Sequence, residues 1–292
     1  MSYAECTCQE NMMDDFEQLK SELLNTISHE LRSPLSSIKG YTATLLRYDK
    51  RLRRDEQREF LEAIRDASDN LSVIVDRLLE MAEFEANAIQ LHSSPVDMVH
   101  LAQEAIDSAG RSRHAMQVTA AHPRFFTFSM HVTDERGLPA ATVPHVQGDQ
   151  RRLREVLDNI LENAMKFSPH SSEISMTLRP VTSSLPAPVR SQGGEIPALA
   201  ELPMLEIKIQ DHGVGIADEH LLRIFERFQR IDTRLIREVN GLGLGLAICK
   251  CIVALHNGYL WAESQPGEGS TFSIWLPLAP VAQTAQMQTT ES

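Results

Sequence analysis

Apolar residues recur at alternating steps of four and three between residues 60 and 81, which is the spacing of a helical heptad repeat. The positions on this seam are Phe60, Ile64, Ala67, Leu71, Ile74, Leu78 and Met81. Helical spacing also runs upstream, through Phe16, Leu19, Leu23, Ile27, Leu31, Ile38, Tyr41 and Leu45, and the stretch 49–58 in between is almost wholly charged. Two long helices joined by a polar turn are therefore predicted. Because a single hairpin leaves half of its seam exposed, we expect two copies to close a four-helix bundle as a homodimer.

The pattern changes after about residue 91, where apolar residues alternate with polar ones at the period of a half-buried strand. The alternating sets are Phe126, Phe128, Met130 and Val132; Ile174, Met176 and Leu178; Leu205, Ile207 and Ile209; and Phe272, Ile274 and Leu276. Helical stretches lie between them, near 151–167 and 244–255. Strands mixed with helices predict an α+β domain, with the boundary to the hairpin near 91–97.

These patterns divide the chain into four parts. They are a lead-in over 1–13, the helical hairpin over 14–91, the α+β domain over 97–280 and a flexible tail over 281–292. Residues 180–203 carry five prolines and two adjacent glycines, which favours a long insert between two strands.

The charge balance excludes one large class of partners. The 292 residues include 28 Lys and Arg against 40 Asp and Glu, a formal charge of −12, so we expect no direct nucleic-acid binding. The chain has no membrane segment, because no run of about eighteen uncharged apolar residues occurs. The Cys-x-Cys pairs Cys6/Cys8 and Cys249/Cys251 match neither a zinc half-site nor a disulfide framework, which indicates a cytoplasmic setting. A redox or metal sensor at Cys6/Cys8 is the alternative.

His29 lies between two seam positions, Ile27 and Leu31. Each helical residue turns the chain by about 100°, so the imidazole is predicted to point to solvent. Glu30 supplies a carboxylate beside the ring, which can accept from one ring nitrogen and leave the other as a nucleophile. The alternative is an ordinary surface histidine.

Pro34 cannot donate a hydrogen bond to the carbonyl of Glu30, so the helix is expected to bend beside His29. The alternative is that Ser33 and Pro34 are the N-cap and first residue of a new helix.

Three polar residues, Asn159, Asn163 and Lys166, lie at steps of four and three beside the apolar stripe of the helix over 151–167. A side-chain amide can coordinate a hard cation, and a lysine offsets phosphate charge. The alternative is that they are surface residues, which cost about half a kcal/mol each in a helix.

Two glycine-containing turns follow. Asp211 ends the inward face of a strand and precedes Gly213 and Gly215, so its carboxylate needs donors. Backbone N–H groups of the turn and an adenine amino group are both candidates, and the two uses are compatible. Gly241, Gly243, Leu244 and Gly245 open an apolar helix, where freed backbone and a helix N-terminus favour an anion. No dinucleotide fingerprint or G-x-x-x-x-G-K-[ST] loop is present.

The order of these motifs resembles that of the sensor histidine kinases. Residues 28–35 (Ser-His-Glu-Leu-Arg-Ser-Pro-Leu) are similar to the family's H-box. The N, G1, F and G2 boxes are matched in turn by Asn159/Asn163/Lys166, Asp211-x-Gly213-x-Gly215, Phe225/Phe228 and Gly241-x-Gly243-x-Gly245, so the resemblance spans about 14–278. It implies a dimeric helical bundle followed by an α/β sandwich of the histidine-kinase, chaperone and gyrase ATPase type.

For the reaction, the resemblance implies that His29 is autophosphorylated with Mg²⁺-bound ATP as the phosphoryl donor. Glu30 would be its polarising or general-base partner. The phosphoryl group would then pass to an aspartate on a response-regulator receiver domain. Ser33 stands where the family often has Thr or Asn for dephosphorylating that partner, so a phosphatase activity is a further expectation.

For the nucleotide, the resemblance implies that Asn163 holds Mg²⁺. Asn159 and Lys166 would serve the phosphates, Phe167 and Leu244 would line the pocket, and Asp211 would bind the adenine amino group. The glycines at 213, 215, 241, 243 and 245 would shape the pocket and the hinges of a lid over 217–240. Phe225 and Phe228 would serve mainly as core residues, with a regulatory role secondary.

Two other classes of function compete. An ATPase of the chaperone, gyrase and mismatch-repair group shares the nucleotide fold, but it has no reason to carry the hairpin with His29. A non-catalytic dimeric scaffold would have no reason to keep Asn163, Asp211 and the glycines.

Overall fold

The computed structural model describes residues 27–48, 51–86, 88–117, 126–168, 172–182, 203–229 and 242–279. The predicted lead-in and tail, Gly241 and most of the predicted insert lie outside these residues. The described residues form two compact units, one with the hairpin and residues 226–247, the other with residues 90–225 and 248–279.

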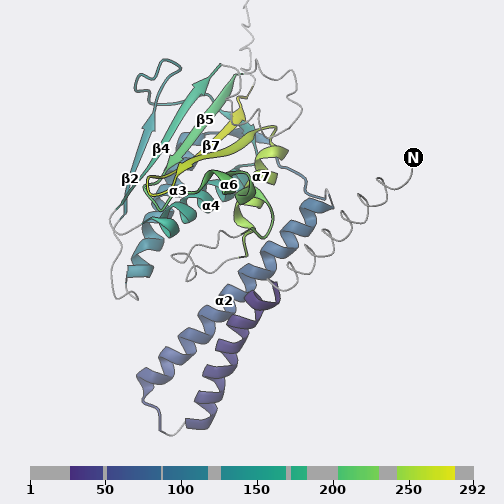
Figure 1. The fold of residues 1–292 in the computed structure, drawn as a ribbon, viewed down its shortest axis with the longest axis vertical. Helices are drawn as coiled ribbons and strands as arrows, with labels where there is room; N and C mark the ends of the chain where they lie inside the picture. The colour runs from purple at the N-terminus through teal and green to yellow at the C-terminus, as the bar shows by residue number, and fades with distance from the viewer. Residues whose placement is uncertain are drawn as a thin grey trace, which may run out of the picture. The chain divides into compact units, whose positions relative to one another are not determined.

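The elements follow one another along the chain as drawn in Figure 1. After a first helix, described over 27–48, they are α2 (Arg54–Glu85), β1 (Ser94–Val96), α3 (Met98–Gln117), β2 (Phe126–Val132), β3 (Val146–Gly148), α4 (Gln150–Phe167), β4 (Ser172–Val181), β5 (Met204–Gln210), α6 (Asp218–Leu221), the short 3-10 helix η2 (Arg223–Phe225), α7 (Gly245–Leu255), β6 (Tyr259–Gln265) and β7 (Gly269–Pro277).

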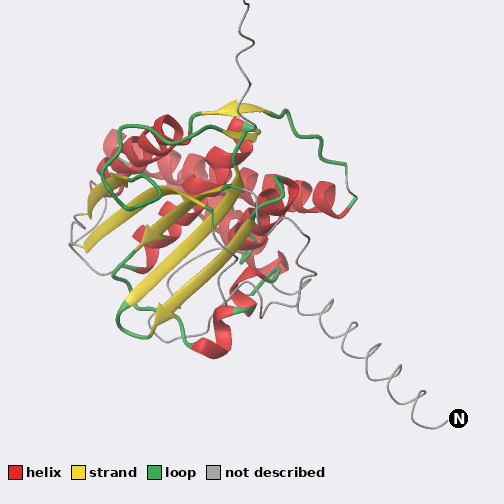
Figure 2. Ribbon diagram, turned by 90° about the horizontal axis from the view of Figure 1, so that it is seen from above, coloured by secondary structure: helices red, strands yellow, loops and turns green. Residues whose placement is uncertain are grey.

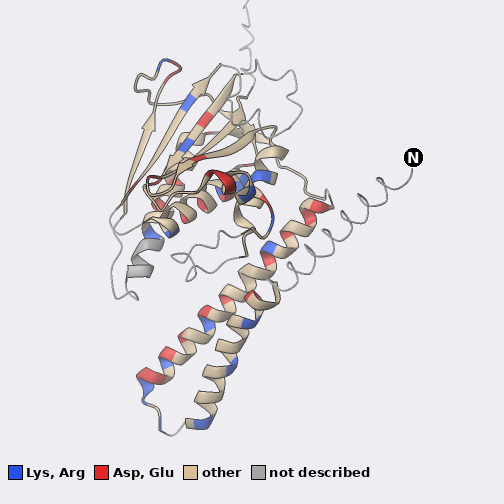
Figure 3. Ribbon diagram, in the orientation of Figure 1, with Lys and Arg blue, Asp and Glu red and all other residues tan. Residues whose placement is uncertain are grey.

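The first helix and α2 form the predicted hairpin. The rings of Tyr41 and Phe60 stack across it at 5.6 Å, close to the turn. Glu56 caps the start of α2, because its carboxylate accepts the backbone N–H of Arg53 at 2.8 Å. Along α2 the seam is the less exposed face, with Ile74 and Met81 buried, and acidic and basic residues are interspersed along the helix (Figure 3).

The helix runs without a break through Pro34, from 27 to 48. The alternative in which Ser33 and Pro34 start a new helix is therefore wrong. A proline has no N–H to donate, so Pro34 itself makes no backbone hydrogen bond to the carbonyl of Glu30.

A mixed five-stranded sheet organises the second unit, in the order β2-β4-β5-β7-β6. Only β2 and β4 are parallel, and the other pairs are antiparallel. The parallel pair requires a crossover, and α4 lies within that connection. A separate antiparallel pair, β1 with β3, leads into α3 and α4.

Helices cover one face of this sheet, as Figure 2 shows from above. The predicted stripe on α4 is buried there, and it comprises Leu153, Leu157, Ile160 and Ala164. Val156 and Leu161 are buried beside it. The alternating apolar residues of β4, β5 and β7 are buried as well. Burial of a Leu or Ile side chain stabilises a fold by about 1.5–3 kcal/mol, so this layer fixes the position of α4.

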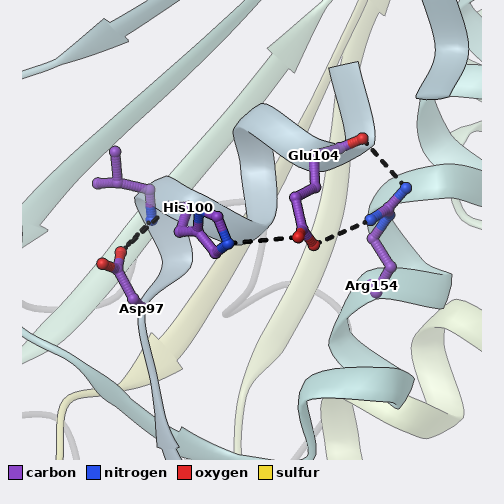
Figure 4. Close-up of polar contacts among 5 residues, drawn as sticks. Asp97, His100, Glu104 and Arg154 are labelled. Atoms are coloured by element: carbon purple, nitrogen blue, oxygen red, sulfur yellow. Dashed lines mark hydrogen bonds and ion pairs between the residues drawn. The ribbon is translucent and has the colours of Figure 1, made fainter. Parts of the chain in front are cut away.

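Polar contacts also tie α3 to α4 (Figure 4). Asp97 caps α3, because its Oδ1 accepts the backbone N–H groups of Val99 at 3.0 Å and His100 at 3.1 Å. Glu104 then bridges the helices, since its carboxylate lies 3.3 Å from both His100 Nε2 and Arg154 Nη1. Arg154 also donates to the backbone carbonyl of Glu104 at 3.1 Å.

The architecture is thus a helical hairpin followed by an α/β sandwich, which confirms the predicted fold class. None of the described helices is long and apolar enough to cross a membrane.

Candidate functional site

The hairpin presents His29 to solvent, as its position beside the seam predicts. Ser33 lies one turn further along the same face and is also exposed, whereas Glu30 is half-buried. The buried Pro34 follows, and Ser37 Oγ donates to the carbonyl of Ser33 at 3.3 Å. An exposed imidazole beside a carboxylate is accessible to a reactant that arrives from solvent.

The three polar residues of α4 lie together on its half-buried face. Asn159 donates its Nδ2 to the carbonyl of Glu155 at 3.0 Å. No described residue hydrogen-bonds to the side chain of Asn163. Lys166 Nζ lies 5.9 Å from the centre of the Phe167 ring. The α4 face therefore offers an amide oxygen and a cation near the C-terminal end of the helix.

The structure brings the turn after Asp211 against that same end of α4. The backbone carbonyl of Phe167 accepts the N–H of Val214 at 3.1 Å. Gly213 sits so close that a Cβ there would lie 2.7 Å from the same carbonyl oxygen. The turn after Asp211 and the C-terminal end of α4 are therefore brought together, although 45 residues separate Lys166 from Asp211 in the sequence.

Asp211 is buried, with 4% of its surface exposed. Its Oδ1 accepts the backbone N–H groups of Gly213 at 2.7 Å and Ser270 at 3.3 Å. Burial raises the pKa of Asp211 above its ordinary value, and these hydrogen bonds only partly offset that effect. None of the described residues donates to Oδ2, so this oxygen can accept from a ligand.

Two serines hold this turn in place, and the sequence patterns did not identify them. Ser264 Oγ accepts the N–H of Ile216 at 2.8 Å and donates to the carbonyl of Gly269 at 2.6 Å. The backbones of Ser270 and Asp211 are also paired, with 2.9 Å between Asp211 N and Ser270 O. The only sequence signal is the glycine-containing turn between β6 and β7, which does not reveal its long-range partner.

The glycine-rich turn before α7 is described from Leu242 onward. Gly243 has φ +67°, a conformation that favours glycine, and its carbonyl accepts the N–H of Phe228 at 3.1 Å. Leu244 is buried and Gly245 is the first residue of α7. These contacts lie within the unit that includes residues 226–247.

The two phenylalanines that match the F box, Phe225 and Phe228, differ in burial and backbone conformation. Phe225 is a core residue, as expected, with 4% of its surface exposed and an edge-on contact to Phe272 at 6.4 Å. Phe228 is half-buried and has φ +61°, which is unusual for a residue with a side chain.

We expect Gly215→Ala to destabilise the fold and weaken any ligand held by Asp211. Gly215 has φ +69°, and a Cβ there would overlap the carbonyl oxygen of Gln265. Strain and overlap together should lower the free energy of unfolding by about 3 kcal/mol, measured by chemical denaturation.

Gly267→Ala is the matched control. Gly267 also has positive φ, +85°, but a Cβ there would meet nothing within 4 Å. Only the conformational cost of about 1 kcal/mol should remain. Equal losses in the two variants would contradict the role assigned to the close approach at Gln265.

The described residues contain no group of three or more His, Cys, Asp and Glu side chains that would hold a metal by themselves. This does not conflict with Mg²⁺, which is commonly bound through one or two protein ligands together with phosphate oxygens and water. The half-buried amide of Asn163 fits such a ligand.

Two family models match the chain. The model described as "His Kinase A (phospho-acceptor) domain" matches residues 19–87, and the model described as "Histidine kinase-, DNA gyrase B-, and HSP90-like ATPase" matches residues 148–280. A similar curated protein is the circadian input-output histidine kinase CikA of Thermosynechococcus vestitus, 31% identical over 265 residues that make up 91% of this chain and 32% of CikA. The chain spans about a third of the length of that protein and of the CikA of Synechococcus elongatus.

Two solved structures share the fold. Full-length ShkA in complex with AMPPNP matches with a TM-score of 0.56 and 25% identity, over 88% of this chain and 46% of ShkA. Histidine kinase ThkA in complex with the response regulator protein TrrA has a TM-score of 0.59 over 96% of this chain and 69% of that one. Its identity of 19% supports a likeness of fold alone.

Proposed function

The chain belongs to the sensor histidine kinases, and from this premise we propose that it is an ATP-dependent protein histidine kinase that phosphorylates its own His29. One observation carries the proposal: the stretch matched by the phosphoacceptor model carries an exposed histidine, His29, next to a carboxylate. An ATPase without histidine transfer has no use for that side chain.

In the proposed reaction, a ring nitrogen of His29 attacks the γ-phosphorus of ATP, and ADP leaves. A P–N bond replaces the P–O bond to ADP, and the ring gives up the proton on its other nitrogen. Glu30 is the proposed acceptor or orienting partner for that proton, because it is the carboxylate that follows His29 in the sequence.

The nucleotide is proposed to bind at the C-terminal end of α4. Asp211 Oδ2 accepts from the adenine amino group, and Asn159 and Lys166 serve the phosphates. Asn163 is the proposed ligand of Mg²⁺, which would neutralise developing charge on the phosphates. Phe167 borders the site through its ring and its backbone carbonyl.

The glycine-rich turn is proposed to close the same site. Gly213 and Gly215 shape the turn after Asp211, while Gly241, Gly243, Leu244 and Gly245 shape the start of α7. The AMPPNP bound to ShkA supports a nucleotide as the ligand of this fold. The lid is proposed to span 217–240.

Each of the two predicted domains has its own proposed role. The hairpin over 14–91 holds the phosphoacceptor, and the domain over 97–280, with its insert at 180–203, holds the nucleotide. The reaction is proposed to occur in the cytoplasm, where ATP is available.

The proposed acceptor of the phosphoryl group is an aspartate on a response-regulator receiver domain, since a phosphohistidine retains a high transfer potential. The complex of ThkA with TrrA is a precedent in fold only. Ser33, exposed one turn after His29, is the proposed position for a phosphatase reaction on that partner, in which water attacks the phospho-aspartate and inorganic phosphate leaves.

Incubation of the full chain with γ-labelled ATP and magnesium tests the function. We expect label on the protein that is lost in acid and kept in base, as for a P–N bond. Release of free phosphate without labelled protein would indicate an ATPase instead. Neither product would indicate a scaffold without turnover.

We also propose a homodimer through the hairpin. Leu61, Val75 and Leu79 form an exposed apolar stripe on α2 beside the seam, with Leu79 59% exposed. Burial of such a stripe in a second copy provides the hydrophobic gain that a four-helix bundle needs.

Val75→Lys is therefore expected to shift the protein from dimer to monomer, as measured by analytical ultracentrifugation. Val73→Lys is the matched control, because Val73 is similarly exposed but lies about 200° around the helix from Val75. A dimer that survives Val75→Lys, or dissociates in Val73→Lys, would place the interface elsewhere.

A further inference from the structure

His256 is a buried histidine that the proposed reaction does not use. It follows the last residue of α7, and 4% of its surface is exposed. Its Nε2 lies 2.9 Å from the backbone nitrogen of Asp149, and its Nδ1 lies 2.8 Å from the carbonyl oxygen of Ile252. A backbone N–H only donates and a carbonyl only accepts, so Nε2 must carry the lone pair and Nδ1 the proton. The two bonds select one neutral tautomer of the ring.

Asp149, whose N–H this ring accepts, is the N-cap of α4. Its Oδ1 accepts the N–H of Arg152 at 3.2 Å, and its Oδ2 accepts the N–H of His92 at 3.0 Å. Burial acts to raise the pKa of Asp149, but hydrogen bonds from the backbones of His92, Arg152 and Arg151 outweigh it and hold the pKa below its ordinary value. The start of α4 is thus held on one side by its own carboxylate and on the other by His256.

A second contact gives the relative direction of the helices. Cys249 Sγ on α7 lies 3.9 Å from the carbonyl oxygen of Val156 on α4. Cys249 precedes His256 along α7, whereas their contact partners on α4 occur in the opposite order, Val156 after Asp149. The two helices therefore run antiparallel, with the start of α7 directed toward the end of α4 that carries Asn159 and Asn163.

Gly148 leaves room for the ring. A Cβ at Gly148 would lie 2.7 Å from His256 Cδ2 and 2.9 Å from Leu153 Cδ1. The imidazole therefore occupies the space that a side chain at residue 148 would need.

We propose that His256 is a positioning residue for nucleotide binding: its neutral imidazole fastens the start of α4 to the end of α7 and thereby sets where Asn159 and Asn163 stand. This inference rests on the proposed function, because it concerns the same nucleotide site.

Two substitutions in the full chain test it by titration calorimetry with AMPPNP and magnesium. His256→Phe keeps a ring but leaves the N–H of Asp149 without an acceptor, so the Kd should rise about tenfold. His256→Gln keeps an acceptor at a similar reach, and its Kd should stay within about twofold of the unsubstituted chain. Equal binding by the Phe variant and the unsubstituted chain, or no rescue by Gln, would overturn the proposal.

Val181→Ala controls for a general loss of stability. Val181 belongs to a separate apolar cluster with Trp261 and Trp275, so this change should lower the melting temperature without changing the Kd. If His256→Phe does not fold, Gly148→Ala provides a second route, because the added Cβ displaces the ring. It should raise the Kd as well, and an unchanged Kd would contradict the proposal.

Nitrogen-15 NMR of the histidine side chains provides a measurement without nucleotide. His256 should show the neutral Nδ1–H form, and a neutral Nε2–H form or a charged ring would overturn the assignment. If the unsubstituted chain binds no AMPPNP, the proposed function fails, whereas the NMR result still decides the arrangement at Asp149. If it binds and the Phe variant binds equally, only the positioning role fails.

Discussion

His29→Gln is expected to abolish transfer of the γ-phosphate to the protein. The glutamine amide has no basic nitrogen lone pair, so it cannot replace the imidazole as a nucleophile, and label should fall below about a thousandth of the unsubstituted level. AMPPNP should bind with unchanged affinity, because His29 lies on the hairpin and not on α4 or the turn after Asp211. The measurement is radiolabel on the protein, together with calorimetry on the same preparation.

His131→Gln is the matched control for that substitution. His131 is an exposed histidine on β2, so the same chemical change is made at a position with no proposed role. Label that persists in the His29 variant would place the phosphoacceptor at another residue. Label lost in the His131 variant would show that the change acts through something other than the nucleophile.

Asp211→Asn should separate stability from nucleotide binding. The asparagine oxygen can still accept from Gly213 and Ser270, but the position of Oδ2 becomes an NH₂ group that faces the adenine amino donor. A lost hydrogen bond and two opposed donors should cost about 2–3 kcal/mol, which raises the Kd for ATP roughly 30- to 150-fold. The melting temperature at neutral pH should stay the same or rise.

The sign of the stability effect follows from the raised pKa of Asp211. Because the folded state holds this proton more tightly than the unfolded chain, the protonated form stabilises the fold at low pH. That contribution is lost as the pH rises through the raised pKa, so at neutral pH the buried charge costs stability. Asparagine removes the charge and the cost.

Asp149→Asn provides a contrast of opposite sign. The pKa of Asp149 is lower in the folded protein than in the unfolded chain. Ionised Asp149 therefore stabilises the fold at pH values above the unfolded-state pKa, and this stabilisation is lost as the pH falls through the folded-state pKa. Its replacement should lower the melting temperature at neutral pH. Thermal unfolding across neutral and acidic buffers measures both variants, and a lower melting temperature for Asp211→Asn at neutral pH would contradict the burial argument.

The sequence predicted those features that depend on periodicity. The steps of four and three on α2 predicted the hairpin, and the period of two identified β2, β4, β5 and β7, because burial of one face imposes each pattern. The steps from Asn159 to Lys166 likewise predicted a shared face of α4. The same argument placed His29 in solvent.

Features that depend on long-range contacts could not be predicted this way. Alternation in β4 and β5 tells which side chains are inward, but not that β7 lies between β5 and β6. Ser264 and Ser270 act through backbone groups of the turn after Asp211, and His256 acts through Asp149, so their partners are far away in sequence. At Pro34, local residue preferences allowed two arrangements, and the structure has the continuous helix.

The ends of β4 and β5 have a consequence for how this chain can change during evolution. Val181 and Met204 are register partners in the ladder, so the chain leaves the sheet and returns to it at neighbouring points. Closing a connection between fixed neighbours costs entropy that grows with the logarithm of its length, about 0.6 kcal/mol for each doubling. Insertions and deletions between these two residues should therefore be tolerated, while Asp211, at the opposite end of β5, keeps its place.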